Sequence, residues 1–575
     1  MNLNKFNNEY SIKDVGKEVS IKGFVQRSRN LGGLIFIDLR DRSGILQVLV
    51  KPDNEYYELA STIKSEYVLM VKGTIVERSN KNKKIENGDI EVELDEHKAL
   101  SKAIDLPFEL VNTTALEDTR LKYRYLDIRR EKIKNNLVLR HNVTKVIRNY
   151  LDDMHFIEVE TPILTKSTPE GARDYLVPSR VYGGRFYALP QSPQLFKQLL
   201  MVGGIERYYQ LARCFRDEDL RADRQPEFTQ LDIEMSYIDT KDVMKIVEGL
   251  VKRLFKDLKD TNLEDSILKI KYNDAINEFG SDKPDLRFDL KINDITDILS
   301  KSGIDILLPE EKEQINCLVL EEKVSRKEQD KLVEFTNKYG LDKLFFLKYE
   351  NKSFAGSLVK NLDEQLLVQL RKHLNLEKDA TIIIGKGEVS NLKKALGALR
   401  LKLGKDYEMF DKKTIKPVWI VDFPLFEYDV DDKRYYSSHH PFTAPLYSDH
   451  DYIDKKDECY SKAYDLVING YEVCGGSIRI SDSEVQSKIF DVLGLSEKEK
   501  NEKFGFLLEA FEYGVPPHGG VAFGLERLVM LLAETENIKD VIAFPKTSSA
   551  QCLMTEAPSS VCDDQLKELS LKQLK

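Results

Sequence analysis

The residues best suited to chemistry lie in the stretch 208–237, where two strand-like runs flank a charged segment. Arg216 follows the first run, and its planar guanidinium could bind a phosphate through two hydrogen bonds. Phe228 opens the second run and offers a flat face for a nucleobase. Asp232 and Glu234 alternate along that run, so both should project from one face of the strand. A solvated hairpin tip would explain the charges as well, but this order of residues suits a nucleotide and an ammonium group.

A second group of candidates lies in the stretch 191–198. Ser192 is a good N-cap and Pro193 a good first helical residue, so we expect a helix to begin there. Gln194 and Lys197 would then share one face of its first turn. A lysine beside an exposed helix start could bind a carboxylate, although a surface lysine is the more usual explanation for such a residue.

Acidic residues and glycines recur near residue 470. Asp465 and Glu472 bracket an apolar strand and could place carboxylates where Mg²⁺ bridges them to a triphosphate. Gly475 and Gly476 would let a ligand approach the backbone. Arg479 follows the glycines and could bind a carboxylate through two hydrogen bonds.

Two further patterns stand out in the C-terminal part of the chain. His439 and His440 stand together before a proline, which is less common than a lone structural histidine. Arg527 lies in the glycine-rich and then apolar run 519–532. An arginine in such a run is costly to bury unless it meets an anion, which could be a ligand or an internal salt-bridge partner.

The composition excludes several classes of protein. With 575 residues, 41% hydrophobic and 32% charged, the chain should form several globular domains. It has no apolar run of membrane-spanning length, and its first residues lack the plan of a signal peptide, so we expect a cytoplasmic protein without a membrane partner. Six scattered cysteines argue against a zinc site or a disulfide framework. A net charge of −10 argues against non-specific nucleic-acid binding over the whole surface.

The pattern of runs predicts five parts. Short alternating runs at 19–25, 34–39, 45–50, 67–76 and 90–94 predict a five-stranded OB-fold barrel over residues 1–105. The charged stretch at 106–135 is consistent with a hinge, and an ordinary solvated linker explains it equally well. A helix from Leu137 and a strand at 156–162 open a domain at 136–284. The insertion 285–416 has helices and strands of its own and no catalytic pattern, and the domain resumes at 417–575.

The run FRDEDLRADRQPEF at 215–228 resembles motif 2 of the class II aminoacyl-tRNA synthetases, in wording close to their bacterial-type aspartyl members. The helix, strand and proline ending at Pro162 resemble motif 1, and GLER at 524–527 resembles motif 3. The resemblance implies a multidomain α/β (α+β) protein with an OB-fold anticodon-binding domain, an antiparallel-sheet catalytic domain and an inserted GAD-like α+β domain. His155 and Cys474 stand where this family usually has glycine.

The resemblance also implies roles for individual residues. The aspartate pocket would contain Glu170, Gln194, Lys197, Arg216, Asp232, His439, His440 and Arg479. The ATP site would contain Arg216, Asp217, Glu218, Gln225, Phe228, Glu472, Gly524, Leu525, Glu526 and Arg527, with Arg216 and Arg527 as the catalytic arginines and Mg²⁺ on Asp465 and Glu472. The tRNA would contact Arg29, Phe36, Gln47, Arg78, Asn82 and Glu91 through its anticodon, and Arg221 and Arg224 through its acceptor end.

By this resemblance the protein activates L-aspartate with ATP and transfers it to tRNA-Asp, acting as a homodimer formed through motif 1. One alternative is a relaxed enzyme that also charges tRNA-Asn. Leu31 favours the restricted kind, because a histidine at that position is typical of relaxed members. A second alternative is an inactive RNA-binding paralogue, which should have lost a phosphate-binding arginine or a magnesium carboxylate. Arg216, Asp465, Glu472 and Arg527 are all present.

Overall fold

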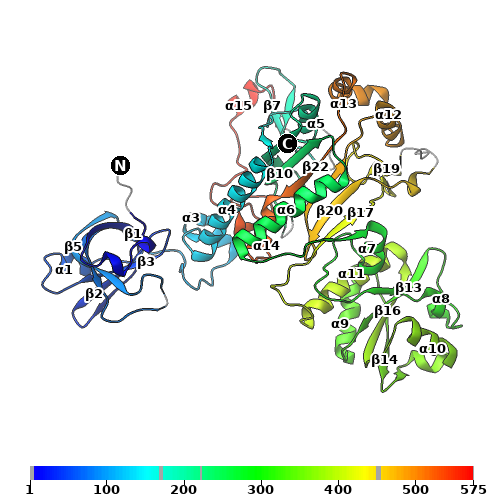
Figure 1. Ribbon diagram of the computed structural model, residues 1–575, viewed down its shortest axis with the longest axis horizontal. Coiled ribbons are helices and arrows are strands. Elements are labelled where there is room, and N and C mark those ends of the chain that lie inside the picture. Colours follow the sequence, from blue (N-terminus) through cyan, green and yellow to red (C-terminus); the bar gives the residue numbers. More distant parts are fainter. Residues whose placement is uncertain (1–4, 84, 168–171, 221–222, 448–454, 574–575) are drawn as a thin grey trace. The chain divides into compact units, whose positions relative to one another are not determined.

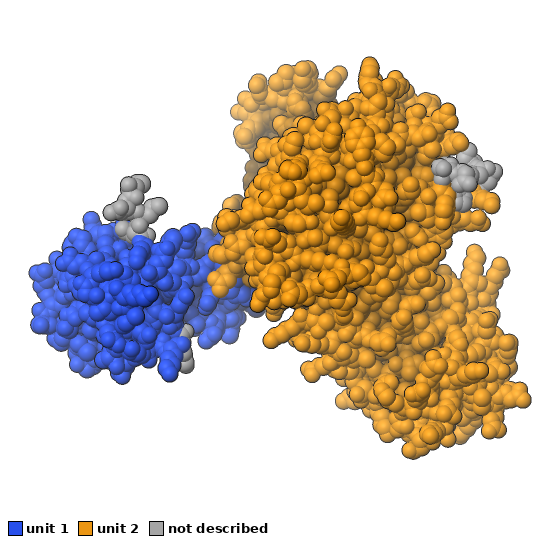
Figure 2. Space-filling model, in the orientation of Figure 1, with its two compact units in different colours: residues 1–134 blue, residues 135–575 orange. Residues whose placement is uncertain are grey.

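The computed structural model describes residues 5–83, 85–167, 172–220, 223–447 and 455–573. The chain forms two compact units, Met1–Lys134 and Asn135–Lys575 (Figure 2), and Figure 1 shows their helices and strands. Within the described ranges, no helix has both the length and the apolar character needed to cross a membrane.

The first unit contains the predicted barrel. Its five strands close in the order β1-β2-β3-β5-β4: β1 (Glu18–Leu31), β2 (Leu34–Arg40), β3 (Ile45–Val50), β4 (Val68–Glu77) and β5 (Ile90–Ser101). Side chains alternate between the inside and the outside of the barrel along each strand. In β2, Ile35, Ile37 and Leu39 are buried, while Phe36 and Asp38 are half-buried on the opposite face. The OB-fold prediction is confirmed, and β1 and β5 continue well past the ends expected for them.

The predicted hinge contains more structure than its charged composition suggested. It holds the short helices α2 (Glu117–Lys122) and α3 (Arg124–Asp127). Asp127 is fully buried and accepts hydrogen bonds from Arg124 at 2.6 Å and Arg130 at 2.8 Å, so its charge is balanced within one turn. The helix expected from Leu137 begins earlier, since α4 spans Glu131–Asp153.

The second unit is built on an eight-stranded sheet of order β11-β17-β20-β21-β22-β10-β9-β6 (Figure 1). The strands are β11 (Leu268–Lys271), β17 (Pro417–Val421), β20 (Ala463–Ile468), β21 (Tyr471–Ile478), β22 (His518–Gly524), β10 (Glu227–Ser236), β9 (Arg207–Phe215) and β6 (Ile157–Glu158). The pairs β11–β17 and β6–β9 at the two edges are parallel, and the pairs between them are antiparallel. The predicted antiparallel catalytic sheet is therefore confirmed.

One face of this sheet packs against helices. Leu231, Ile233 and Met235 of β10 join a core cluster with residues of α4, α6 (Thr240–Lys259) and α14 (Leu525–Leu532). Because side chains alternate along a strand, Asp232 and Glu234 point to the other face. That face lies toward α5 (Gln194–Val202), and α5 packs with α12 (Ser483–Val492) and α13 (Glu497–Glu512) in a smaller core cluster.

Residues inserted between β11 and β17 form a separate layered sheet of order β12-β13-β16-β14-β15. Its strands are β12 (Ile292–Asp294), β13 (Glu313–Leu320), β14 (Leu344–Glu350), β15 (Ser353–Ala355) and β16 (Ala380–Glu388). Helices α9 (Arg326–Asn337) and α11 (Val389–Asp406) share a core with one face, and α8 (Thr296–Leu299) and α10 (Glu364–His373) share a core with the other. Helix α7 (Tyr272–Phe279) precedes this insertion.

Three local expectations can be compared directly with the backbone. His155 has φ +63°, so it adopts the left-handed conformation that favours glycine. Cys474 is 1% exposed in the core between the sheet and its helices, and the β20–β21 register shifts directly before it, since Leu466 pairs with Cys474 but Val467 pairs with Glu472. The prediction for α5 was one residue off: the helix begins at Gln194 and Pro193 is its N-cap, while Ser192 Oγ accepts a hydrogen bond from the Gln194 N–H at 3.3 Å.

Candidate active site

A cavity of about 420 Å³ opens over the polar face of the central strands. Side chains from α5, the β9–β10 hairpin, β20 to β22 and the start of α14 line it. The predicted residues found there are Gln194, Lys197, Arg216, Glu218, Arg224, Gln225, Phe228, Asp232, His439, His440, Asp465, Glu472, Arg479, Gly524, Glu526 and Arg527. Residues distant in the sequence thus meet in one cavity. Glu170 and Arg221 lie outside the described residues.

At the base of the cavity, four charged side chains form what we call the buried charge network: Lys197, Asp232, Glu234 and Arg479. Lys197 Nζ lies 3.0 Å from Asp232 Oδ1 and 3.3 Å from Glu234 Oε2. Arg479 donates to Glu234 Oε1 at 2.8 Å through Nε and to Oε2 at 3.0 Å through Nη2. None of the four side chains is more than 2% exposed. The surface-lysine explanation for Lys197 is therefore wrong.

The two carboxylates of the network differ in whether they have an oxygen without a hydrogen-bond partner. Both Glu234 oxygens are taken by cations, whereas Asp232 Oδ2 is buried and has no hydrogen-bond partner among the described residues. Burial raises the pKa of Asp232, and Lys197 opposes that rise. Burial also disfavours the charged form of Glu234, but Arg479 and Lys197 outweigh it and lower its pKa to about 2. Glu234 is thus held as an anion by the protein, while Asp232 offers a free oxygen to an incoming cation.

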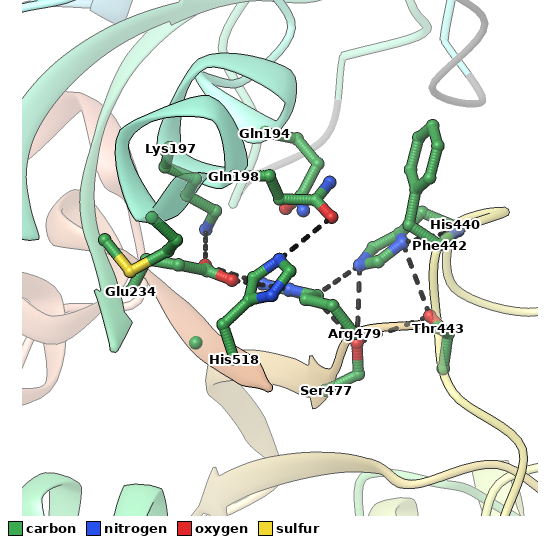
Figure 3. Close-up of polar contacts among 12 residues, drawn as sticks. Gln194, Lys197, Gln198, Glu234, His440, Phe442, Thr443, Ser477, Arg479 and His518 are labelled. Carbon is green, nitrogen blue, oxygen red and sulfur yellow. Dashed lines mark hydrogen bonds and ion pairs between the residues drawn. The ribbon is translucent and has the colours of Figure 1, made fainter. Parts of the chain in front are cut away.

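Neutral polar groups surround the network (Figure 3). Arg479 Nη1 donates to Ser477 Oγ at 2.7 Å and also contacts His440 Nε2. His518 Nε2 lies 3.3 Å from Gln198 Oε1. Burial lowers the pKa of both His440 and His518, so neither ring adds a positive charge at neutral pH. The network keeps two cations and two anions, with one edge of the Arg479 guanidinium turned away from Glu234.

The nucleotide side of the cavity contains the two predicted catalytic arginines. The Arg216 guanidinium lies 5.1 Å from the centroid of the Phe228 ring, and its buried Nε has no hydrogen-bond partner within the described part of the chain. Arg527 Nη2 lies 3.2 Å from Asp223 Oδ2, and its Nη1 donates to the Glu472 carbonyl at 3.2 Å. Arg527 therefore forms an internal salt bridge, as one interpretation of the sequence expected, and it also lines the cavity.

Two predicted nucleotide-binding residues already have internal partners. The Gln225 amide exchanges hydrogen bonds with the Lys546 backbone at 2.7 and 3.2 Å. Glu526 accepts hydrogen bonds from the Thr229 N–H at 3.0 Å and from Arg140 at 2.8 Å. These contacts tie the two parts of the catalytic domain together, so both residues position the cavity wall whatever they contribute to a ligand.

Three other residues predicted to bind the nucleotide have local contacts or a burial that restricts how they could reach a ligand. Glu218 forms an ion pair with Arg224 at 3.0 Å. The Asp217 backbone N–H donates to the Arg173 carbonyl at 3.0 Å. Leu525 is 1% exposed in the core, so only its backbone could reach a nucleotide. The nucleotide-binding roles of these residues remain predictions.

The residues predicted to hold Mg²⁺ fit a divalent cation. A β-carbon added to Gly475 would lie 2.5 Å from Asp465 Oδ1 and 3.7 Å from Glu472 Oε1, so the two carboxylates converge over the space that this glycine leaves open. Asp465 Oδ1 is buried and has no hydrogen-bond partner among the described residues. Burial, followed by the charge of Glu472, raises the pKa of Asp465 well above its ordinary value. Two close carboxylates with an unused oxygen are suited to a hard cation.

Five of the predicted anticodon-binding residues also meet, on the outer face of the barrel, whereas Asn82 lies in the connection from β4 to β5, where its N–H donates to the Gly88 carbonyl at 2.9 Å. Arg29 lies opposite Phe36 in the β1–β2 pairing. Gln47 donates to Glu91 at 2.7 Å and accepts from Arg78 at 2.7 Å, which links β3, β5 and the end of β4. Phe36 is absent from the barrel core cluster, so the explanation of this residue as ordinary core is wrong.

Comparison with known proteins is consistent with this geometry. A family model described as tRNA synthetases class II (D, K and N) matches residues 116–548, and one described as OB-fold nucleic acid binding domain matches residues 19–96. The chain belongs to the class II tRNA synthetases. It is 51% identical over 573 residues to the aspartate–tRNA(Asp/Asn) ligase of Bacillus mycoides, with 98% of this chain and 97% of that protein covered. It is 50% identical over 568 residues to the aspartate–tRNA ligase of Geobacillus kaustophilus, with 97% and 96% covered.

Solved synthetase structures share the fold. An asparaginyl-tRNA synthetase from Pyrococcus horikoshii superposes with a TM-score of 0.60 at 19% identity, covering 95% of this chain and 99% of that one. An aspartyl-tRNA synthetase from Entamoeba histolytica gives a TM-score of 0.58 at 19% identity, covering 94% and 91%.

Four further residues surround the predicted pocket residues, namely Glu234, which the sequence marked only as sharing a strand face with Asp232, and Gln198, Ser477 and His518. Glu234 carried a usable signal, because it shares a strand face with Asp232 and an acid on a buried face needs a cationic partner. The others carried none, since a single polar residue in a strand or helix does not indicate what packs against it.

The buried charge network predicts the effect of neutralising Glu234. Glu234→Gln keeps the shape of the side chain but leaves Arg479 and Lys197 with one anion between them. We expect the free energy of unfolding of the 135–575 unit to fall by about 3–5 kcal/mol in urea titrations, because breaking a buried ion pair leaves an uncompensated charge.

Glu227→Gln is the matched control for that change. Glu227 lies on the same strand and pairs with Arg213 at 2.7 Å and Lys546 at 2.8 Å, but it is 37% exposed. Its loss should cost less than about 1 kcal/mol. Equal stability of the two variants would show that Glu234 does not balance the buried cations.

Proposed function

We propose that this synthetase is an aspartate–tRNA ligase: it activates L-aspartate with ATP and transfers the aspartyl group to tRNA-Asp. The observation that carries the proposal is the buried charge network. It presents a carboxylate oxygen that is unpaired among the described residues, Asp232 Oδ2, in the same small pocket as Arg479, whose Nη1 contacts the neutral groups of Ser477 and His440. L-Aspartate needs that combination, because it carries an ammonium group and a second carboxylate a few bonds away. The names of the relatives point to the same substrate.

The pocket suggests how the amino acid is held. The substrate ammonium pairs with Asp232 Oδ2, which has no other partner among the residues described. The side-chain carboxylate meets Arg479 Nη1 and Lys197, near His440. The α-carboxylate then faces Gln194, whose buried Nε2 is likewise unpartnered in the described ranges. His439, Glu170 and Arg216 complete the set proposed for aspartate.

Rejection of asparagine follows from these donors. Lys197 and Arg479 are already balanced by Asp232 and Glu234, so neither offers a ligand an unmatched charge. What remains for a ligand is a set of N–H donors. An asparagine amide would turn its own NH₂ donors toward them or leave a buried donor unpaired, and either outcome costs binding free energy.

Activation requires positioning and charge neutralisation more than covalent help. The α-carboxylate of aspartate attacks the α-phosphorus of ATP, and pyrophosphate leaves. Arg216 binds the α-phosphate with its unpaired Nε. Phe228 and Arg527 bind on either side of the adenine, with Glu218, Gln225, Asp217 and the 524–526 backbone at the edges of the nucleotide. Asp465 and Glu472 would hold Mg²⁺, which supplies neutralisation of phosphate charge when bound.

The tRNA contacts are proposed on both units. On the barrel, Phe36 offers a half-buried aromatic surface beside Arg29 for stacking an anticodon base. Gln47, Arg78, Asn82 and Glu91 supply hydrogen-bonding groups around it. In the catalytic domain, Arg224 and Arg221 of the motif 2 loop hold the acceptor end. This activity on ATP and tRNA belongs in the cytoplasm.

A homodimer through motif 1 is part of the proposal. The segment that follows α4 leaves Ile157, Ile163 and Leu164 about half exposed, which a partner chain would bury. Light scattering should therefore give the mass of two chains, and the mass of one chain would exclude the dimer.

Aspartate-dependent ATP–pyrophosphate exchange tests the central activity. Wild-type protein should exchange with aspartate and not with asparagine. Arg479→Lys keeps a cation for Glu234 but loses the second guanidinium edge, so kcat/KM for aspartate should fall at least about a hundredfold, or about 2.7 kcal/mol. Absence of exchange in folded wild-type protein would favour the inactive RNA-binding alternative.

Charging of purified tRNA-Asp and tRNA-Asn separates the restricted enzyme from the relaxed one. Relatives of both names are similar to this chain. Leu31, 59% exposed at the β1–β2 hairpin, favours the restricted enzyme. We expect tRNA-Asp to be charged much faster, and comparable rates for the two tRNAs would establish the relaxed activity instead.

Phe36→Ala separates recognition of tRNA from activation. The barrel lies in its own unit, and Phe36 is outside its core. Loss of one stacked base costs about 1–3 kcal/mol, so KM for tRNA-Asp should rise about 5- to 150-fold. ATP–pyrophosphate exchange should be unchanged, and a fall in exchange would mean that Phe36 supports the structure rather than the tRNA.

A further inference from the structure

A lysine with no assigned role stands at the proposed metal carboxylates. Lys283 Nζ lies 2.9 Å from Glu472 Oε2, and Arg527 Nη1 lies 3.9 Å from the same oxygen. Lys283 belongs to the connection from α7 into the insertion, outside all three motifs. Its side chain is 37% exposed, so a charged group in solution can reach it.

The backbone of Lys283 is held against the hairpin that carries both metal carboxylates. Gly470 lies in the turn between β20, which contains Asp465, and β21, which contains Glu472. A β-carbon added to Gly470 would lie 3.9 Å from the Lys283 carbonyl oxygen and 3.5 Å from Asp285 Cβ. The connection therefore packs directly on the turn, and Lys283 reaches Glu472 from a fixed position.

The insertion fixes this connection from its other side. Arg400 of α11 is 1% exposed and donates to the carbonyls of Asp285 at 2.7 Å, Phe288 at 3.0 Å and Leu290 at 2.6 Å. Its guanidinium also lies 4.1 Å from the centroid of the Phe288 ring. A buried arginine that satisfies three carbonyls of one segment makes that segment rigid. The insertion thereby determines where Lys283 stands.

Charge then decides what Lys283 does. An ammonium 2.9 Å from Glu472 Oε2 repels a divalent cation that binds to the same carboxylate group. We propose that Lys283 is the resident counter-ion of the Asp465–Glu472 pair, placed there by the insertion, and that it weakens binding of free divalent metal so that the metal enters together with ATP. The negative charge of the triphosphate compensates the ammonium, which free metal cannot do. This inference rests on the proposed function for the identity of the metal carboxylates.

Binding of free Mn²⁺ to the nucleotide-free, full-length protein tests the proposal, with unbound Mn²⁺ measured by electron paramagnetic resonance. Lys283→Met removes the charge and keeps the stem, so Mn²⁺ should bind about tenfold more tightly or better. Lys283→Arg keeps the charge and should retain the weak binding of the wild type. Lys291→Met is the matched control: it breaks a lysine–glutamate pair of the same connection, with Glu278 at 2.7 Å, and should leave Mn²⁺ binding unchanged.

A double variant locates the gained site. In Lys283→Met with Glu472→Gln the tight binding should disappear. Unchanged or weaker binding in Lys283→Met, or tight binding that survives in the double variant, would overturn the role of Lys283. Because the measurement uses no nucleotide, its result is independent of the exchange assay. If the wild-type protein catalyses exchange but Lys283→Met binds Mn²⁺ no more tightly, only this inference fails. If Lys283→Met binds Mn²⁺ about tenfold more tightly but the wild-type protein shows no exchange, only the proposed ligase activity fails.

Discussion

The pairing of Glu234 with both Arg479 and Lys197 is the interaction on which the site depends. Two cations buried at the base of a cavity would repel each other and lose their hydration, so they need a fixed anion between them. Glu234 provides it by giving both oxygens to them. With the charges balanced by the protein, Asp232 Oδ2 has no partner among the described residues, and Arg479 Nη1 contacts the neutral groups of Ser477 and His440, which a ligand carboxylate can replace.

The fold makes this arrangement possible through the sheet. Antiparallel neighbours β9, β10, β22 and β21 bring the network together, with helices covering the opposite face. Glycines keep the polar face open: a β-carbon on Gly520 would lie 2.2 Å from Glu234 Oε2, and one on Gly475 would lie 2.5 Å from Asp465 Oδ1. The same face therefore carries the amino acid pocket and the metal carboxylates side by side. The insertion takes part as well, since its α11 holds the connection that bears Lys283.

Much of this could be predicted from the sequence, for identifiable reasons. The period of two along β10 placed Asp232 and Glu234 on one face, and short alternating runs predicted the barrel strands. The partner of Glu234 could not be predicted, because Arg479 lies 245 residues away and only the sheet brings them together. The burial of Lys197 could not be predicted from the helix pattern, which does not show what covers its polar side, and only the family resemblance placed this residue in the pocket. Lys283 stands in a polar, proline-containing run typical of a surface loop, so its residue type and neighbours do not indicate a functional role.

The most direct test is a crystal structure with L-aspartate and a non-hydrolysable ATP analogue. The substrate ammonium should lie within hydrogen-bonding distance of Asp232 Oδ2, and its side-chain carboxylate should contact Arg479 Nη1 and Lys197 while Glu234 keeps its two bonds to Arg479. A side-chain carboxylate that displaces Glu234 from Arg479, or that binds elsewhere in the cavity, would contradict the account.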